Sequence, residues 1–176
     1  ERDTDGQFPE DFVKDMADGG WLGIAMPEEY GGSGLGVIEA ALMMQTIAES
    51  GAGFSGASAV HINIFGPHPL VVHGTDEQKQ KHLPALIAGK DRSCFGVTEP
   101  NAGLDTTRIE TKAVRKGDHY IVNGRKMWTS TAQTANKILL LARTTPREEG
   151  KKPTDGITMF YTDFDRKYCE AQVIEK

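Results

Sequence analysis

The spacing of apolar residues changes near residue 92, and this change constrains the fold more than any other feature of the sequence. Before that point, apolar residues recur about every 3.6 positions, which is typical of helices; after it they recur about every second position, which is typical of strands. The sequence therefore predicts an α+β chain with an all-α N-terminal domain (residues 1–92), followed by an antiparallel β-barrel or sandwich domain (residues 93–176).

Turn and cap signals divide the first domain into helices. Pro9 suits a first helical turn, Thr75 suits an N-cap, and glycines follow the apolar runs. We expect Pro84 to break or kink the last of these helices. The predicted helices cover residues 8–16, 37–50, 53–65, 67–74 and 75–89.

Alternating residues and tight-turn signals divide the second domain into strands. Lys116-Gly117-Asp118 and Asn123-Gly124 are strong turn signals. At least six β segments are expected, from the set 94–98, 111–115, 119–122, 126–130, 137–144, 156–162 and 170–174.

Charge and cysteine content exclude several function classes. The net charge is −5 and the pI is about 5.5, so we expect no nucleic-acid partner, because such a partner requires a basic face. Cys94 and Cys169 form neither a disulfide framework nor a metal knuckle, and we interpret them as reduced thiols. The five histidines have no partners at metal-ligand spacing, so no metal site is expected.

Two segments resemble functional motifs without meeting their requirements. Ser50–Thr75 lacks charged residues over a length that would cross a bilayer, but its glycines, prolines and histidines favour buried helices, and no membrane span is expected. Gly34-Leu35-Gly36 lacks the full G-x-G-x-x-G spacing and a preceding strand, so we interpret it as a loop.

Four stretches, in this order, resemble the acyl-CoA dehydrogenase family and together cover most of residues 8–145. Each alone would be a weak signal, whereas four in sequence with plausible spacing are specific. They are PEEYGGSG, GTDEQKQKHLPALIAG, CFGVTEPNAGLDT and NGRKMWTS.

The resemblance implies a subunit of three parts: a helical domain, a central β domain and a C-terminal four-helix bundle. On this pattern the chain holds the first domain without its opening helix and most of the second, cut at its end, while the bundle is absent. Family members bind FAD between the β domain and the bundle and desaturate an acyl-CoA thioester. A hydride passes to flavin N5, and the electrons pass on to an electron-transfer flavoprotein. Homotetramers or homodimers, a role in fatty acid metabolism, and a bacterial cytoplasmic or mitochondrial matrix location are also implied.

The family pattern assigns cofactor-binding residues to two segments of this chain. In the first, Phe95, Val97 and Thr98 would border the flavin ring, and the backbone amides of the loop 101–104, including Gly103 and Leu104, would hold the diphosphate. In the second, residues 128–130, Trp128 would lie against the ring and Ser130 would reach N5. Thr129 belongs to the same cofactor segment and would point to the opposite face of its predicted strand.

Two features limit the transfer of family roles. Leu104 stands where the family often has a serine near the cofactor phosphate and the substrate thioester, so it keeps a backbone amide but lacks the hydroxyl. The family's catalytic base is a glutamate on the C-terminal bundle, so no residue of this chain is assigned that role, and the fragment alone is expected to be inactive. We interpret Glu99, beside Pro100, as a loop-fixing residue.

Two alternatives remain open. One is a relative on the same scaffold, an acyl-CoA oxidase or a flavin monooxygenase, in which reduced flavin reacts with oxygen. The other is a non-catalytic interaction protein that keeps the scaffold without flavin.

Overall fold

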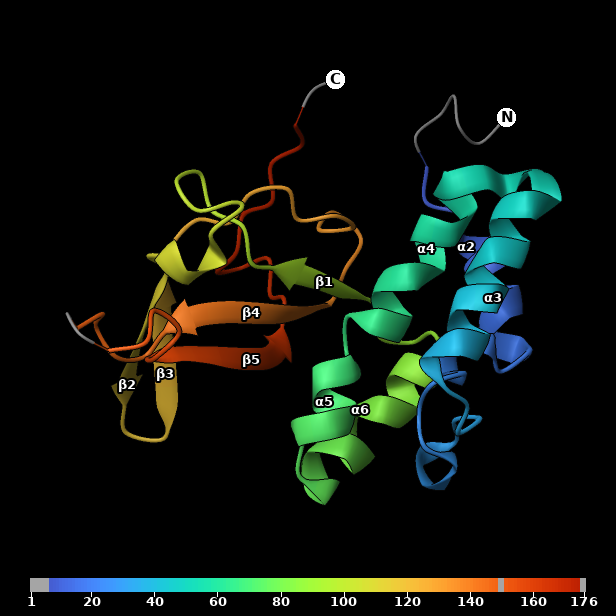
Figure 1. Cartoon of the computed structure of the whole chain (residues 1–176), viewed down its shortest axis with the longest axis horizontal. Coiled ribbons are helices and arrows are strands. Elements are labelled where there is room, and N and C mark those ends of the chain that lie inside the picture. Colours follow the sequence, from blue (N-terminus) through green and yellow to red (C-terminus); the bar gives the residue numbers. More distant parts are fainter. Residues whose placement is uncertain (1–6, 149–150, 175–176) are drawn as a thin grey trace. The chain divides into compact units, whose positions relative to one another are not determined.

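The computed structural model describes residues 7–148 and 151–174, and the chain divides into two compact units at the bond between Ser93 and Cys94 (Figure 1). The first unit is helical and the second is built on a sheet. The predicted order of a helical domain followed by a β domain is therefore confirmed.

The helical unit packs its helices around an apolar core that includes Leu22, Ala40 and Val60, none of which is exposed. The helix predicted over 37–50 is α-helical only to residue 47, after which the chain widens into a π-helical turn that contains Gly51 at φ +94°. The elements of this unit are α2 (Glu10–Asp18), η1 (Trp21–Gly23), η2 (Glu28–Tyr30), α3 (Val37–Ile47), η3 (Ala48–Ala52), α4 (Gly53–Phe65), α5 (His68–His73) and α6 (Asp76–Ile87).

Helix α6 begins at the predicted cap and passes through its internal proline. The Thr75 hydroxyl accepts from the Gln78 amide at 3.2 Å, and the Gln78 side chain accepts from the Thr75 amide at 2.9 Å. This reciprocal capping box satisfies two amide groups that would otherwise lack helical partners. Pro84 does not end the helix, since α6 continues through it to Ile87. Leu86 and Ile87, beyond the proline, are buried in the unit.

The β unit contains a mixed sheet of five strands among its described residues. β4 pairs with β5 along its whole length, from Lys137 opposite Asp163 to Arg143 opposite Ile157, and β2 pairs with β3 as a hairpin. Both pairs are antiparallel, but Lys112 of β2 pairs in parallel with Arg143, so the sheet is not wholly antiparallel, and the described strands do not close into a barrel. The strands are β1 (Ser93–Gly96), β2 (Lys112–Lys116), β3 (His119–Asn123), β4 (Lys137–Arg143) and β5 (Ile157–Asp163).

Two predicted strands, 126–130 and 170–174, are not strands in the structure. In the first, Trp128 has φ +59°, which interrupts the extended backbone that an alternating pattern predicts. In the second, Gln172 turns its side chain to Glu170 at 2.9 Å, and the polar residues of this segment bury little apolar surface. The alternation of residue types was therefore misleading in both places.

Arg143 anchors the loops at one end of the β unit. Its guanidinium is buried and donates to the carbonyl oxygens of Ile109 at 2.9 Å, Asp155 at 3.2 Å and Thr107 at 2.5 Å. These bonds hold the segments before β2 and before β5 against the end of β4.

Among residues 7–148 and 151–174, no helix is both long enough and apolar enough to traverse a bilayer.

Candidate cofactor site

The two segments that carry the predicted cofactor residues lie together in the β unit. The Met127 amide donates to the Thr98 carbonyl oxygen at 2.8 Å. One residue earlier, Lys126 Nζ donates to the Val97 carbonyl oxygen at 3.1 Å and to Glu99 Oε1 at 2.8 Å. Backbone and side chain thus join the end of β1 to the loop that follows β3.

Glu99 is buried and holds the turn after β1. Its Oε2 accepts from the Glu110 amide at 2.6 Å, and its Oε1 accepts from the Thr111 amide at 3.0 Å. Its own backbone makes a reciprocal bridge with Ala102, at 3.0 and 3.1 Å. These contacts support the interpretation of Glu99 as a loop-fixing residue, since both of its carboxylate oxygens are occupied.

The Glu99–Lys126 pair lies in a buried setting that shifts the pKa of both groups. Burial acts to raise the pKa of Glu99, but the hydrogen bonds from Lys126 and from the amides of residues 110 and 111 outweigh it, and the pKa is held below its ordinary value of 4.5. Burial is the largest effect on Lys126 and lowers its pKa below 10.5, while hydrogen bonding and charge attraction to Glu99 oppose that change. Glu99 is therefore held as a carboxylate, and its hydrogen bond and charge favour the charged form of Lys126 against burial.

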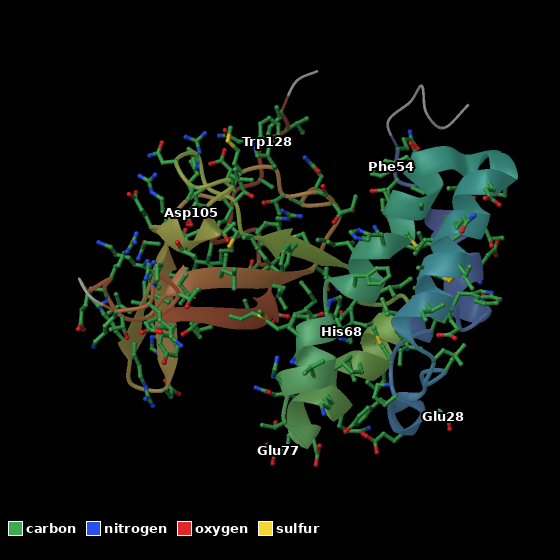
Figure 2. All side chains as sticks on the ribbon, viewed as in Figure 1. Glu28, Phe54, His68, Glu77, Asp105 and Trp128 are labelled. Carbon is green, nitrogen blue, oxygen red and sulfur yellow. The ribbon has the colours of Figure 1, made fainter. Side chains whose placement is uncertain are left out.

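Trp128 projects from this loop in an unusual backbone conformation. Trp128 and Thr131, at φ +59° and +62°, are the two residues other than glycine with positive φ in the described part of the chain. A bulky residue there is strained by about 1 kcal/mol or more. The Trp128 side chain is 66% exposed and lies among the loops of the β unit (Figure 2), so it is not an ordinary core aromatic.

The two residues after Trp128 present different hydroxyl groups. Thr129 Oγ1 is buried and has no hydrogen-bond partner, whereas Ser130 is exposed. Because residues 126–130 do not form a strand, the predicted placement of Thr129 on the opposite strand face is wrong. A buried hydroxyl without a partner is unfavourable in the folded chain and suits a position where a ligand group completes the bond.

The first predicted segment is open to solvent along much of its length. Phe95 is 40% exposed and Leu104 is fully exposed, while Val97 and Thr98 are half-buried. Gly103 has free space beside it, because a Cβ added there would meet Thr98 Cγ2 only at 3.9 Å.

One part of the predicted phosphate loop is already used by the fold. The Ala102 amide donates to the Glu99 carbonyl oxygen, so the expectation that every amide of 101–104 is free is wrong. The amides of Gly103 and Leu104, on the exposed part of the loop, remain suited to a diphosphate.

These residues fit the ring and phosphate ends of a flavin nucleotide. An exposed indole and phenyl ring supply apolar surface, Thr129 supplies an unpaired hydroxyl, and the exposed loop supplies backbone amides. No cluster of three metal-ligating side chains occurs in the part of the chain that the structure describes.

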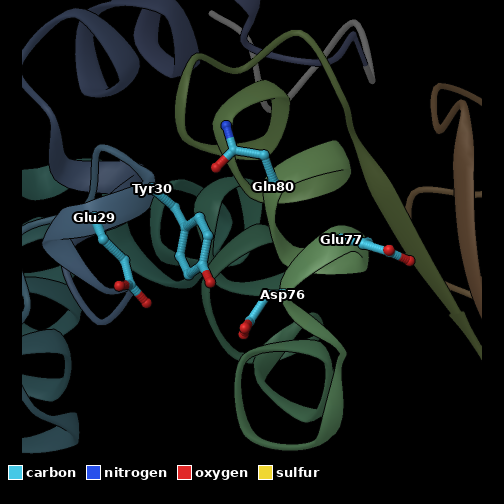
Figure 3. Close-up of a pocket in the computed structure, with 5 residues that line it drawn as sticks. All are labelled: Glu29, Tyr30, Asp76, Glu77 and Gln80. Carbon is cyan, nitrogen blue, oxygen red and sulfur yellow. The ribbon is translucent and has the colours of Figure 1, made fainter.

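Each unit also contains a surface hollow. One of about 490 Å³ lies in the helical unit and is lined by Glu29, Tyr30, Asp76, Glu77 and Gln80 (Figure 3). Burial, followed by the nearby carboxylates of Glu29 and Asp76, raises the pKa of the Tyr30 phenol. Three carboxylates make this hollow unsuitable for a phosphate.

A second hollow of about 290 Å³, in the β unit, is lined by Glu99, Pro100, Asn101, Glu110, Thr111, Gly124 and Arg125. Of the residues assigned to the cofactor, only Asn101 of the loop 101–104 lines one of these hollows.

Comparison with known proteins tests the resemblance directly. Residues 1–90 match the family model described as "Acyl-CoA dehydrogenase, N-terminal domain", and residues 94–174 match "Acyl-CoA dehydrogenase, middle domain". The chain belongs to the acyl-CoA dehydrogenase family. The resemblance drawn from the four stretches is thereby confirmed, and the family is one of flavoprotein oxidoreductases.

Individual acyl-CoA dehydrogenase relatives agree. The chain is 40% identical over 168 residues to the probable acyl-CoA dehydrogenase YngJ of Bacillus subtilis, covering 89% of this chain and 43% of that protein. The acyl-CoA dehydrogenase of Geobacillus kaustophilus superposes with a TM-score of 0.80 at 31% identity, over 92% of this chain and 42% of that one. A structure described as the FAD complex of PigA gives a TM-score of 0.83 at 26% identity, with the same coverage of 92% and 42%. The chain thus spans about two fifths of the length of these relatives.

Lys126 is the site residue that the sequence analysis missed. It lies within NGRKMWTS, but a lysine next to an arginine in a charged segment ordinarily indicates a solvated surface. Its burial depends on contacts with residues 27 and 29 positions earlier, which no local pattern reveals.

Proposed function

We propose that the polypeptide containing this chain is an FAD-dependent acyl-CoA dehydrogenase and that the β unit holds one side of the flavin. The observation that carries this proposal is the strained, exposed Trp128 beside the unpaired hydroxyl of Thr129, on a loop bonded directly to Val97 and Thr98. When bound, FAD supplies the electron acceptor for desaturation of an acyl-CoA thioester between Cα and Cβ.

Each segment has a separate task in this proposal. Trp128 provides a flat apolar surface that excludes water from one face of the ring. The hydroxyls of Thr98, Thr129 and Ser130 orient the polar edge of the ring by hydrogen bonds. The amides of Gly103 and Leu104 receive the diphosphate oxygens without a basic side chain, since small backbone nests bind anions.

The proton-removing base is not proposed from this chain. Glu99 is unsuitable because both carboxylate oxygens accept hydrogen bonds inside the fold. The family pattern assigns the base to the C-terminal bundle, and it also supports an electron-transfer flavoprotein as the electron-accepting partner, a homo-oligomeric assembly, and a bacterial cytoplasmic or mitochondrial matrix location.

Replacement of Trp128 by alanine in the full-length protein tests the proposal. Loss of an aromatic contact of about 1–2 kcal/mol predicts a dissociation constant for FAD roughly ten times higher, together with slower acyl-CoA desaturation. Trp21→Ala is the matched control, because Trp21 is also half-exposed but lies in the helical unit. If coenzyme retention and turnover both survive Trp128→Ala unchanged, the proposal fails.

The same protein preparation separates the remaining alternatives. Acyl-CoA added without oxygen is expected to bleach the flavin absorbance, and air is expected to restore it slowly. Rapid peroxide formation in air would instead indicate an oxidase. Absence of flavin absorbance, both before and after addition of FAD, would indicate a non-catalytic relative.

A further inference from the structure

Lys126 lies across the end of β1 with most of its side chain buried. The side chain is 10% exposed, and its stem passes Gly96, where an added Cβ would meet Lys126 Cγ at 3.5 Å. Its ammonium group then reaches the Val97 carbonyl oxygen and the Glu99 carboxylate. A lysine is seldom buried to this extent unless it is paired, so its position requires a reason in the structure.

Glu99 supplies the compensating charge and extends the connection to a third segment. Through its two oxygens it also holds the amides of Glu110 and Thr111, which lead into β2. The pair therefore ties together the end of β1, the start of β2 and the loop after β3. Removal of either charge leaves the other buried without its partner.

The residues that follow Lys126 occupy the strained part of the loop. The Met127 amide is fixed to the Thr98 carbonyl oxygen, and the chain then turns at Trp128 with positive φ. Beyond the turn, the Ala135 amide donates to the Thr131 carbonyl oxygen at 2.9 Å. Strained backbone of this kind persists only where the surrounding structure holds it on both sides. Lys126 and Met127 provide the hold on the N-terminal side.

We propose that Lys126, with Glu99 as its counter-charge, is a positioning residue that keeps the turn at Trp128 in its binding conformation before the cofactor arrives. This inference rests on the proposed function of the same surface. A loop that is already ordered loses less conformational entropy on binding, so the pair increases flavin affinity without touching the flavin. Lys126 differs in this respect from Trp128 and Ser130, which are proposed to contact the cofactor.

A purely stabilising ion pair would have a different signature. It would raise the resistance of the β unit to unfolding, but its loss would leave the folded protein with the same exposure of Trp128 and the same affinity for FAD. The test therefore measures the loop itself in the cofactor-free protein as well as cofactor binding.

The experiment compares Lys126→Met and Lys126→Arg in the full-length protein, both in a Trp21→Phe background that leaves Trp128 as the only tryptophan of this chain. Residual tryptophans outside this chain are subtracted with a matching Trp128→Phe sample. In the cofactor-free form, quenching of Trp128 fluorescence by acrylamide is expected to change by at least about 1.5-fold in Lys126→Met. The dissociation constant for FAD is expected to rise about tenfold or more, corresponding to about 1.4 kcal/mol. Lys126→Arg, which keeps the charge and its donors, is expected to recover most of both properties.

Lys137→Met is the matched control. Lys137 belongs to the same unit, its side chain is 16% exposed, and its ammonium pairs with Asp163 at 2.5 Å. This pair joins β4 to β5, whereas the Lys126 pair joins the end of β1 to the loop after β3. Its loss is expected to leave both Trp128 quenching and FAD affinity within twofold of the parent values.

The double variant Glu99→Gln with Lys126→Met leaves no unpaired buried charge, and Glu99→Gln alone is its reference, because the glutamine NH2 no longer accepts from one of the Glu110 and Thr111 amides. A folded double variant that still binds FAD about tenfold more weakly supports the proposal. Parental FAD affinity and quenching in the single or the double variant would overturn it, since Lys126 would then only neutralise Glu99. Failure of the parent protein to bind FAD would instead remove the proposed function, while the quenching comparison would still decide the role of Lys126.

Discussion

At the scale of single residues, Glu99 shows how a carboxylate beside a predicted cofactor loop becomes part of the scaffold. It is 7% exposed and makes an ion pair and two amide hydrogen bonds. Each bond favours the charged form of Glu99 and opposes the effect of burial on its pKa. Glu99 therefore stays a carboxylate, which makes it a poor base for removing a proton.

Glu99→Gln is expected to lower the free energy of unfolding by about 3 kcal/mol near neutral pH, because it leaves Lys126 buried without its counter-charge and replaces one amide-accepting oxygen with an NH2 donor. Equilibrium denaturation in urea, followed by far-ultraviolet circular dichroism, measures the change. Glu110→Gln is the control, since the described contacts of Glu99 involve the backbone amide of Glu110 and not its side chain.

The difference in free energy of unfolding between the parent protein and Glu99→Gln is expected to depend on pH. The folded pKa of Glu99 lies below its ordinary value of 4.5, so its contribution is complete above that value and is lost as the pH falls through the folded pKa. The gap between the parent and Glu99→Gln is therefore expected to narrow as the pH is lowered from about 5 toward about 3. A gap that stays constant over this range would show that the carboxylate charge makes no contribution.

Cys94 gives a second prediction at this scale. Its thiol is fully buried, and burial raises its pKa to about 12, so very little reactive thiolate forms near neutral pH. Cys169 is only partly buried, and its pKa is also raised, chiefly by burial. We expect iodoacetamide to label Cys169 slowly and Cys94 only after unfolding, as measured by peptide mass spectrometry. Equal labelling rates in the native protein would contradict the buried position of Cys94.

At the scale of elements, α4 holds the chain segment that leads into β1. Asn63 of α4 is buried, donates to the Asp91 carbonyl oxygen at 2.9 Å and accepts from the Ser93 amide at 2.9 Å. The Asn63 side-chain amide thus makes one donated and one accepted hydrogen bond with the backbone, as a neighbouring strand would. A bidentate ion pair between Arg92 and Glu10 of α2, at 3.0 and 2.5 Å, holds the same segment from another side.

Asn63→Ala is expected to lower the free energy of unfolding by about 2 kcal/mol, because it removes the side-chain hydrogen bonds to the Asp91 carbonyl oxygen and from the Ser93 amide. Asn63→Asp is expected to be at least as damaging, since an oxygen would then face the Asp91 carbonyl. Gln45→Ala is the control: this exposed side chain bonds only to Glu49 within its helical region, a contact of a few tenths of a kcal/mol. The denaturation midpoint of Gln45→Ala is expected to be the highest of the three variants, and that of Asn63→Asp to be no higher than that of Asn63→Ala. Any other ranking would show that the Asn63 contacts are not maintained.

Signals that act within a few residues predicted the elements well. The capping box at Thr75, the turn at Gly117 and the alternating hairpin strands are local, and the structure contains α6, β2 and β3 where they indicate. The loop 126–130 was predicted as a strand because its side chains alternate, yet its conformation is set by contacts of Lys126 with residues 97 and 99. Such distant contacts are absent from any local pattern, so neither the strained turn nor the buried lysine was predictable.

At the scale of the whole molecule, the candidate cofactor residues come from two segments of one unit. The segments 95–104 and 128–130 both belong to the sheet unit, and Lys126 and Met127, directly before the second segment, hydrogen-bond to Val97 and Thr98 of the first. Their positions in the family motifs were predictable from the sequence, whereas their exposure and the unpaired Thr129 hydroxyl required the structure.

Fragments of the coenzyme test this division of labour in the full-length protein. If the loop at Gly103 and Leu104 holds the diphosphate while Trp128 holds the ring, FAD is expected to raise the thermal unfolding midpoint by several degrees. A ligand at 100 times its dissociation constant adds about 2.7 kcal/mol to the stability of the folded state. Riboflavin, which lacks the diphosphate and the adenosine, is expected to give less than half that shift at equal concentration, and Trp128→Ala is expected to reduce both shifts. Equal midpoint shifts for riboflavin and FAD in the parent protein would show that the loop at Gly103 and Leu104 does not bind the diphosphate of FAD.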